Sequence, residues 1–169
     1  MLIYMSMVGG SHTGQLFGES AGGAMILALL LHHAHPHPKV PSLCLPSGHR
    51  LGPTLLISPA GPVRTSAPSM TGNHGKDMIT TDVLDRLWAV IKANHDPDVE
   101  LINPWLTPSL SLYEEWYADL PVSKVTIIIG DLEILRDDLV RISNVIKVGS
   151  TRACLLWTRL LLLYTRANM

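Results

Sequence analysis

The chain has 169 residues, of which 47% are hydrophobic and 16% charged, and its formal net charge at pH 7 is −1. These values fit one globular domain and exclude a disordered tail. Lysine and arginine are scattered along the chain, so neither nucleic acid nor an anionic membrane surface is an expected partner. A small or neutral substrate fits this composition better.

The cysteines and the chain ends indicate a cytoplasmic protein. Cys44 and Cys154 fit no metal-binding spacing and are expected to be free thiols in a reducing compartment. The first ten residues, MLIYMSMVGG, lack the basic region of a signal peptide. The apolar stretch 153–164 contains Arg159 and is shorter than the roughly 20 residues that a membrane-spanning helix needs.

Apolar runs and turn residues alternate along the chain. In order, they predict a strand at 14–17 with the residues before it, a buried helix at 21–33, a loop rich in Pro, Gly and His at 33–52, a buried strand at 53–59, a loop at 60–76, an amphipathic helix at 77–95 with Thr80 or Thr81 as N-cap, an extended connection at 96–108, a short helix at 109–118, a strand at 124–130 and a helix at 137–147. This alternation predicts an α/β fold with a mainly parallel sheet covered by helices.

The segment GESAG, from Gly18 to Gly22, matches the nucleophile elbow pattern G-x-S-x-G between a predicted strand and a predicted helix. The turn would leave room only for small side chains two residues before and after Ser20, hence Gly18 and Gly22. The N–H of Ala21 would point at the oxyanion that forms when Ser20 attacks a carbonyl. The structural alternative is a glycine-rich turn with no chemical role.

The longer string GESAGGAMILALLL resembles the hormone-sensitive-lipase-like branch of the α/β-hydrolases, which includes arylacetamide deacetylases, fungal steryl acetyl hydrolases and microbial carboxylesterases. The resemblance continues through LLISP, INPW and LPVSKVTIIIGDLEILRDD, over about residues 14–147. It implies a partial α/β-hydrolase domain over 1–150, followed by an atypical Leu-rich segment at 151–169. It also implies hydrolysis of a small hydrophobic ester without a metal or organic cofactor.

The same resemblance indicates an acid for a catalytic triad. Aligning LRDD with the family segment D-x-L-R-D-[DE] places Glu133 at the acid position, where the family more often has aspartate. Asp131, on the same loop after a strand, is the alternative acid, and the order of serine before acid is that of α/β-hydrolases. The structural alternative is that these carboxylates, with Asp137 and Asp138, only favour the start of the next helix.

The histidine of the triad should follow the acid, yet every histidine precedes Glu133. They are His12, His32, His33, His35, His37, His49, His74 and His95. The HGGG-type oxyanion segment expected upstream of the elbow is also missing. The tract HHAHPHP has no carboxylate or cysteine nearby to complete a metal site, so no metal is expected.

These features together predict a serine carboxylic-ester hydrolase with Ser20 as nucleophile and Glu133 as acid. One alternative is a catalytically inactive hydrolase-like fragment, and another is an acyltransferase or esterase tailoring step in secondary metabolism. The chain would be the central and later part of an esterase domain, produced by truncation or by a changed gene model near 148–151. Self-association is expected through an exposed sheet edge or through the apolar C-terminal segment.

Overall fold

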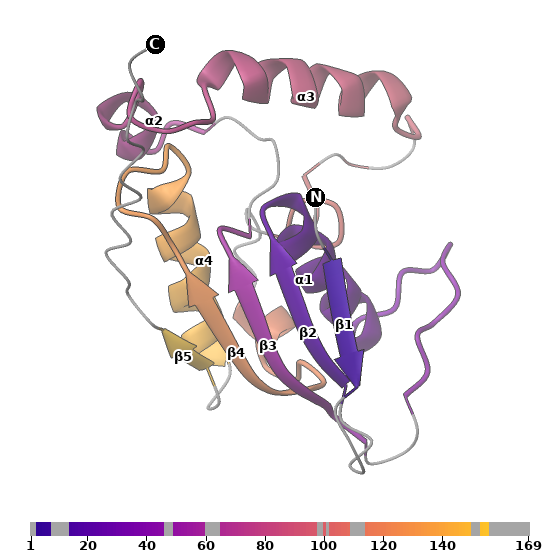
Figure 1. The fold of residues 1–169 in the computed structure, drawn as a ribbon. Coiled ribbons are helices and arrows are strands. Elements are labelled where there is room, and N and C mark those ends of the chain that lie inside the picture. The colour runs from indigo at the N-terminus through magenta and orange to yellow at the C-terminus, as the bar shows by residue number, and fades with distance from the viewer. Residues whose placement is uncertain are drawn as a thin grey trace.

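The computed structural model describes residues 3–7, 14–45, 49–59, 65–97, 100, 102–108, 114–149 and 153–155. Within them the strands form one five-stranded sheet in the order β1-β2-β3-β4-β5 (Figure 1). These strands are β1 (Ile3–Met7), β2 (Gly14–Glu19), β3 (Leu51–Ile57), β4 (Val122–Ile128) and β5 (Ala153–Leu155). β2 to β5 are parallel, and β1 is antiparallel to β2. The predicted α/β class with a mainly parallel sheet is confirmed.

The three predicted strands appear as β2, β3 and β4, with shifted ends. β3 begins two residues before the predicted start, because Leu51 pairs with Val122 of β4. The sequence analysis did not separate β1 as a strand of its own and missed β5, which lies in the segment predicted to be atypical. β5 has three residues, too few to show the alternation that marks a strand.

Two helices, α1 (Ala21–Ala34) and α4 (Arg136–Gly149), lie on the same face of the sheet (Figure 1). Their apolar side chains form the main core with β2, β3, β4 and the 3₁₀ helix η2 (Glu114–Tyr117), which lies within the predicted helix 109–118. The most deeply buried members are Leu27, Leu30, Leu31, Leu56, Tyr117, Leu120, Leu139, Ile142 and Ile146. The predicted buried helix at 21–33 appears as α1, most of whose residues are buried, although Met25 is 50% and Leu29 40% exposed.

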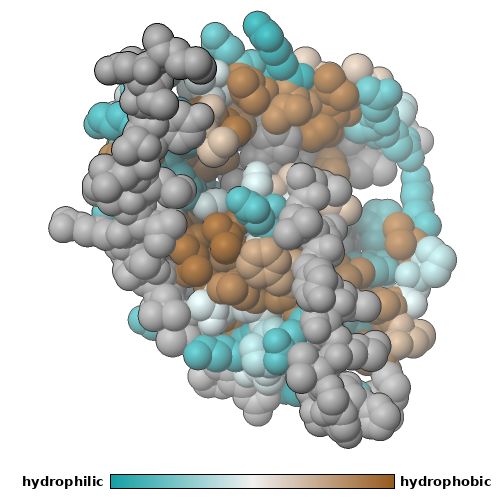
Figure 2. All heavy atoms as spheres, in the orientation of Figure 1, coloured by the Kyte–Doolittle hydropathy of each residue, from teal (hydrophilic) through white to brown (hydrophobic). Residues whose placement is uncertain are grey.

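The other face of the sheet is only half-buried in the part of the chain that the structure describes. Successive strand residues point to opposite faces, and those of this face include Phe17, Leu55, Ile57 and Ile128. Figure 2, in the orientation of Figure 1, shows apolar atoms over these strands. Helices α1 and α4 therefore cover one face, and the prediction of a sheet covered by helices is met on that face.

Two more helices, α2 (Pro68–Gly72) and α3 (Thr81–Asn94), lie beyond the carboxyl ends of the strands (Figure 1). α2 lies inside the predicted loop 60–76 and begins with Pro68, whose missing N–H costs nothing in a first turn. α3 starts later than predicted, and Thr80 is its N-cap, because its hydroxyl accepts the Val83 N–H at 3.4 Å. Of the two predicted caps, Thr80 is confirmed.

The predicted extended connection at 96–108 is wrong near residues 104–106, which form a turn, and the Thr107 N–H donates to the Asn103 carbonyl across it at 2.9 Å. The Asn103 side chain accepts hydrogen bonds from the N–H groups of Trp105 (3.0 Å) and Leu106 (2.7 Å), a pattern that folds the chain back on itself. Elsewhere in the described chain, Cys44 is exposed and free. No described helix is long and apolar enough to cross a membrane.

Candidate functional site

Ser20 occupies the turn between β2 and α1. Its backbone has φ 51° and ψ −124°, and its side chain is exposed. Its N–H donates to the carbonyl of Ile57 at 2.8 Å, and its carbonyl accepts the N–H of Ala24 at 3.1 Å. A positive φ is uncommon for serine and persists where the surroundings hold it. The turn is the strained strand-to-helix corner that a nucleophile elbow requires.

Close contacts explain the small residues around this turn. A Cβ atom on Gly18 would lie 2.8 Å from the Gly23 nitrogen and 2.9 Å from the Gly22 carbonyl carbon. A Cβ atom on Gly23 would lie 2.8 Å from the Cβ of Pro59. Gly18 and Gly22 were singled out from the pattern, whereas Gly23 was missed, because its neighbour Pro59 lies far along the chain.

Ala21 is the first residue of α1, directly after Ser20. The N-terminus of this 14-residue helix carries a partial positive charge from its unpaired N–H groups. Ser20 does not cap these groups with its own side chain. The helix start is therefore suited to stabilise negative charge next to the Ser20 hydroxyl.

Glu133 lies in the loop after β4. Its Oε1 accepts the Ser58 hydroxyl at 2.5 Å and the Gly130 N–H at 2.7 Å. A Cβ atom on Gly130 would come within 2.7 Å of the same oxygen, so glycine leaves room for the carboxylate. Burial raises the pKa of Glu133 above its ordinary value, the bonds from Ser58 and Gly130 oppose this rise, and the charge of Asp77 adds to it.

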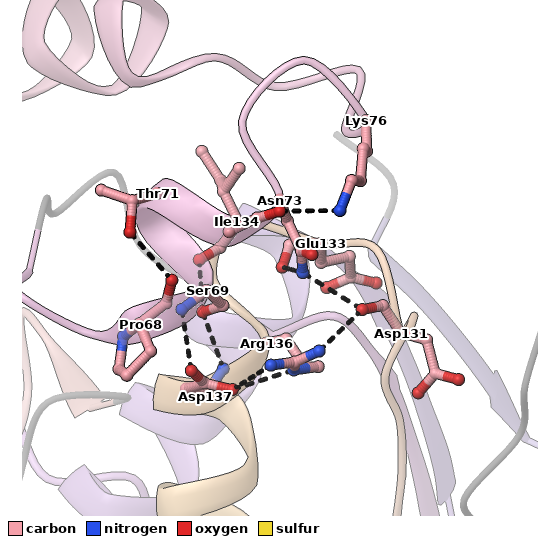
Figure 3. A network of polar contacts seen from close by, with 11 residues as sticks. Pro68, Ser69, Thr71, Asn73, Lys76, Asp131, Glu133, Ile134, Arg136 and Asp137 are labelled. Atoms are coloured by element: carbon pink, nitrogen blue, oxygen red, sulfur yellow. Dashed lines mark hydrogen bonds and ion pairs between the residues drawn. The ribbon is translucent and has the colours of Figure 1, made fainter.

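Two side chains from the segment after β3 shape the acid loop. Asn73, 5% exposed, donates from Nδ2 to the carbonyls of Glu133 (2.8 Å) and Asp131 (3.1 Å), as Figure 3 shows. Asp77 accepts the N–H of Ile134 at 2.7 Å. In Figure 3 the Asp131 side chain extends away from Glu133. Sequence analysis missed Ser58, Asn73 and Asp77, since no local pattern links them to the acid.

A second polar cluster joins α2 to the start of α4 (Figure 3). Asp137 accepts the Ser69 N–H at 2.8 Å and pairs with Arg136, also at 2.8 Å. Partial burial favours a higher pKa of Asp137, but the bonds from Arg136 and Ser69 outweigh it and hold the pKa below the ordinary value. Asp137 and Asp138 lie in the first turn of α4, as the structural alternative expected for these two carboxylates.

The parallel strands bring these groups to one edge of the sheet. Ser20 follows β2, Ser58 follows β3 and Glu133 follows β4, and β3 pairs with both neighbours. The carboxyl ends of parallel strands are where open α/β sheets place their ligands. Ser20 and Glu133 therefore share the edge expected for a site, on either side of the end of β3.

The described histidines do not complete this site. α1 carries His32 about 18 Å along its axis from Ser20 at a rise of about 1.5 Å per residue. The rings of His32 and His33 bond to the carbonyls of Pro41 and Leu43, both at the far end of α1. Among the described residues no histidine hydrogen-bonds to Glu133, and no three or more His, Cys, Asp or Glu side chains are grouped to hold a metal. His12 lies outside the described residues.

Solved structures with a similar fold include several esterases. Carboxyl esterase 2 from the mycorrhizal fungus Tuber melanosporum matches with a TM-score of 0.64 and 17% identity, over 85% of this chain and 41% of that one. An esterase of the bacterial hormone-sensitive lipase family matches with a TM-score of 0.57 and 22% identity, over 85% of this chain and 42% of that one. A thermostable esterase from Pseudomonas putida matches with a TM-score of 0.61 and 17% identity, over 85% of this chain and 39% of that one. The chain therefore spans about two fifths of these proteins.

Among curated proteins, no sequence matches the chain. A family model described as alpha/beta hydrolase fold matches residues 11–154, from before the elbow to β5. The match includes both the Ser20 turn and the Glu133 loop. Because it covers most of the chain, the protein belongs to the α/β-hydrolase fold family.

Proposed function

We propose that this chain carries the nucleophile and the acid of a serine carboxylic-ester hydrolase. The observation that carries the proposal is the strained Ser20 turn, which exposes a serine directly before the N-terminus of α1. The esterase activity named for the similar structures supports the same reaction class. A small hydrophobic ester is the proposed substrate, and no metal or organic cofactor is needed for this chemistry.

In the proposed reaction the Ser20 Oγ attacks the ester carbonyl carbon, and its proton passes to a histidine. The N–H of Ala21 stabilises the oxyanion of the tetrahedral intermediate. The alcohol leaves with the proton, and water then hydrolyses the acyl-serine. Glu133 would orient a histidine and stabilise its charged form. The complete site therefore needs a histidine at the Glu133 carboxylate, and none of the described residues supplies one at hydrogen-bond distance.

The test compares the purified chain with Ser20→Ala in hydrolysis of p-nitrophenyl acetate and butyrate. Hydrolysis is expected to fall to the uncatalysed background in Ser20→Ala, because the attacking oxygen is lost. Ser42→Ala is the matched control, since Ser42 is an exposed serine on the loop after α1. Equal rates for the wild-type chain and Ser20→Ala would contradict the proposal.

The second candidate is a hydrolase-like chain without turnover, favoured by the lack of a described histidine bonded to Glu133. A fluorophosphonate probe separates the two functions, because it reports an activated serine without turnover. Labelling of Ser20 in the wild-type chain supports the hydrolase. An acyltransferase would use the same acyl-serine with an alcohol in place of water, and added alcohol would then yield a new ester.

A further inference from the structure

The segment 57–59, directly after β3, connects the nucleophile elbow with the acid loop. The carbonyl of Ile57 accepts the N–H of Ser20 at 2.8 Å. The N–H of Ser58 donates to the carbonyl of Ile128, at the end of β4, at 2.9 Å. Pro59 is fully buried and packs against the Gly23 backbone of α1. One short corner therefore contacts both halves of the candidate site.

Ser58 has an unusual backbone for its position. Ser20 and Ser58 are the two non-glycine residues with positive φ in the described chain, and the φ of Ser58 is 46°. Residues held in such sparsely populated conformations need support from their surroundings and gather at functional sites. Here the support comes from the bond to Ile128 on one side and from buried Pro59 on the other.

The hydroxyl of Ser58 is directed at the carboxylate of Glu133. Both described hydrogen bonds to this carboxylate, from Ser58 (2.5 Å) and from the Gly130 N–H (2.7 Å), end on Oε1. Two donors on one oxygen restrain the position of Oε1, while Oε2 has lone pairs for a further donor. The charge of Asp77 also acts on Glu133: it disfavours the ionised carboxylate and so raises the pKa of Glu133.

We propose that Ser58 is a positioning residue for Glu133. Its hydroxyl holds Oε1, so that Oε2 is the oxygen that receives the N–H of the catalytic histidine. Because the same corner also accepts the N–H of Ser20, it sets the acid relative to the nucleophile. This inference rests on the proposed role of Glu133 as the triad acid.

The test is an NMR titration of the side-chain carboxyls in the full chain labelled with ¹³C-glutamate, with Glu133→Gln used to assign the Glu133 signal. In Ser58→Ala the titration midpoint of Glu133 is expected to move upward, because the ionised carboxylate loses a donor. Ser69→Ala is the matched control. It removes a hydroxyl that donates to the Ile134 carbonyl in the same loop and leaves the Glu133 carboxylate untouched.

Ser58→Gly separates the hydrogen bond from the backbone strain, since glycine adopts positive φ freely but also lacks the hydroxyl. An upward shift in both Ser58 variants supports the inference, and Ser58→Gly keeps the test open if Ser58→Ala does not fold. An unchanged midpoint in Ser58→Gly, or an equal shift in Ser69→Ala, would overturn it.

The titration needs no turnover, so its outcome is independent of the esterase assay. A shifted midpoint together with equal hydrolysis by the wild-type chain and Ser20→Ala would retain the Ser58 contact and reject the proposed function. Where Ser20-dependent hydrolysis is present, Ser58→Ala is expected to lower kcat and leave KM unchanged. Fluorophosphonate labelling of Ser58 in place of Ser20 would also overturn the inference, because Ser58 would then be the attacking group.

Discussion

At the residue scale, Gly18 is the position where the elbow tolerates least change. A methyl group there would meet the backbone of Gly22 and Gly23 and the Cδ1 of Ile26 at 2.6 to 2.9 Å. Backbone atoms cannot move aside as a flexible side chain can, so Gly18→Ala is expected to lower the free energy of unfolding by about 1–3 kcal/mol. Urea denaturation measures this loss.

Gly14→Ala is the control for this prediction, because Gly14 lies in the same strand and a Cβ atom there meets nothing within 4 Å. It is expected to leave stability unchanged or slightly improved, since alanine has less backbone freedom in the unfolded chain. Equal stability of the two variants would contradict the crowding that defines the elbow.

The raised pKa of Glu133 predicts a pH dependence of stability. The Glu133 carboxyl holds its proton more tightly in the folded chain than in the unfolded chain, where its pKa has the ordinary value of 4.5. The contribution of Glu133 to stability is therefore fully present below pH 4.5 and is lost as the pH rises through the raised pKa of the folded chain. Glu133→Gln removes this dependence because glutamine does not titrate. As the pH rises from 4.5 through the raised pKa, the wild-type chain is therefore expected to lose stability relative to Glu133→Gln, as urea denaturation at each pH would measure.

Asp137 is expected to show the opposite sign. The pKa of Asp137 lies below its ordinary value of 3.8. Its carboxylate therefore stabilises the fold above pH 3.8, and this contribution is lost as the pH falls through the lowered pKa. Asp137→Asn should therefore destabilise the chain at neutral pH and differ less from the wild-type chain in acid. The same slope in both variants would contradict the assigned environments.

At the scale of elements, α3 depends on its N-cap. The Thr80 hydroxyl accepts the Val83 N–H, and α3 has only Leu84 buried. Thr80→Ala is expected to destabilise the helix by about 1 kcal/mol and to speed amide hydrogen exchange in residues 81–94. Thr81→Ala is the control, because Thr81 is the first residue inside the helix. Faster exchange in Thr81→Ala than in Thr80→Ala would place the cap one residue later.

At the scale of the whole molecule, strand residues on one face of the sheet are only half-buried in the part of the chain that the structure describes. Parallel sheets are normally covered on both faces. Leu55 and Ile57 on this face are expected to bind a hydrophobic dye, and replacing both with threonine should lower the dye fluorescence while keeping good strand formers. Met78→Thr is the control, because Met78 is a 90% exposed apolar residue that lies before α3 and outside this sheet face. Equal fluorescence in both variants would contradict this expectation.

Self-association was expected from a free sheet edge or from the C-terminal segment. β5 is the last strand on its side of the described sheet, and residues 156–169 lie outside the described residues. Self-association stays a prediction, and sedimentation velocity over a range of concentrations tests it: a constant sedimentation coefficient would contradict it.

Local patterns were enough for some features of this protein. The Ser20 turn, the apolar helix after it and the strand 124–130 each depend on residues within a few positions of one another, and the structure has them near the predicted places. The Thr80 cap is local as well. Side-chain period and turn chemistry act over such short distances, so the α/β class and the turn at Ser20 could be predicted from local patterns alone.

The position of the Glu133 side chain depends on contacts between segments that lie far apart in the sequence. Ser58 and Asn73 lie 75 and 60 residues from Glu133 along the chain, yet both bond to it. Gly23 is small because Pro59 packs against it, and Ser58 is strained because β4 holds its N–H. Such contacts arise when parallel strands bring their carboxyl ends together, and no spacing within one segment encodes them. The Ser20 turn could thus be predicted from five neighbouring residues, whereas the surroundings of Glu133 follow from the pairing of three strands.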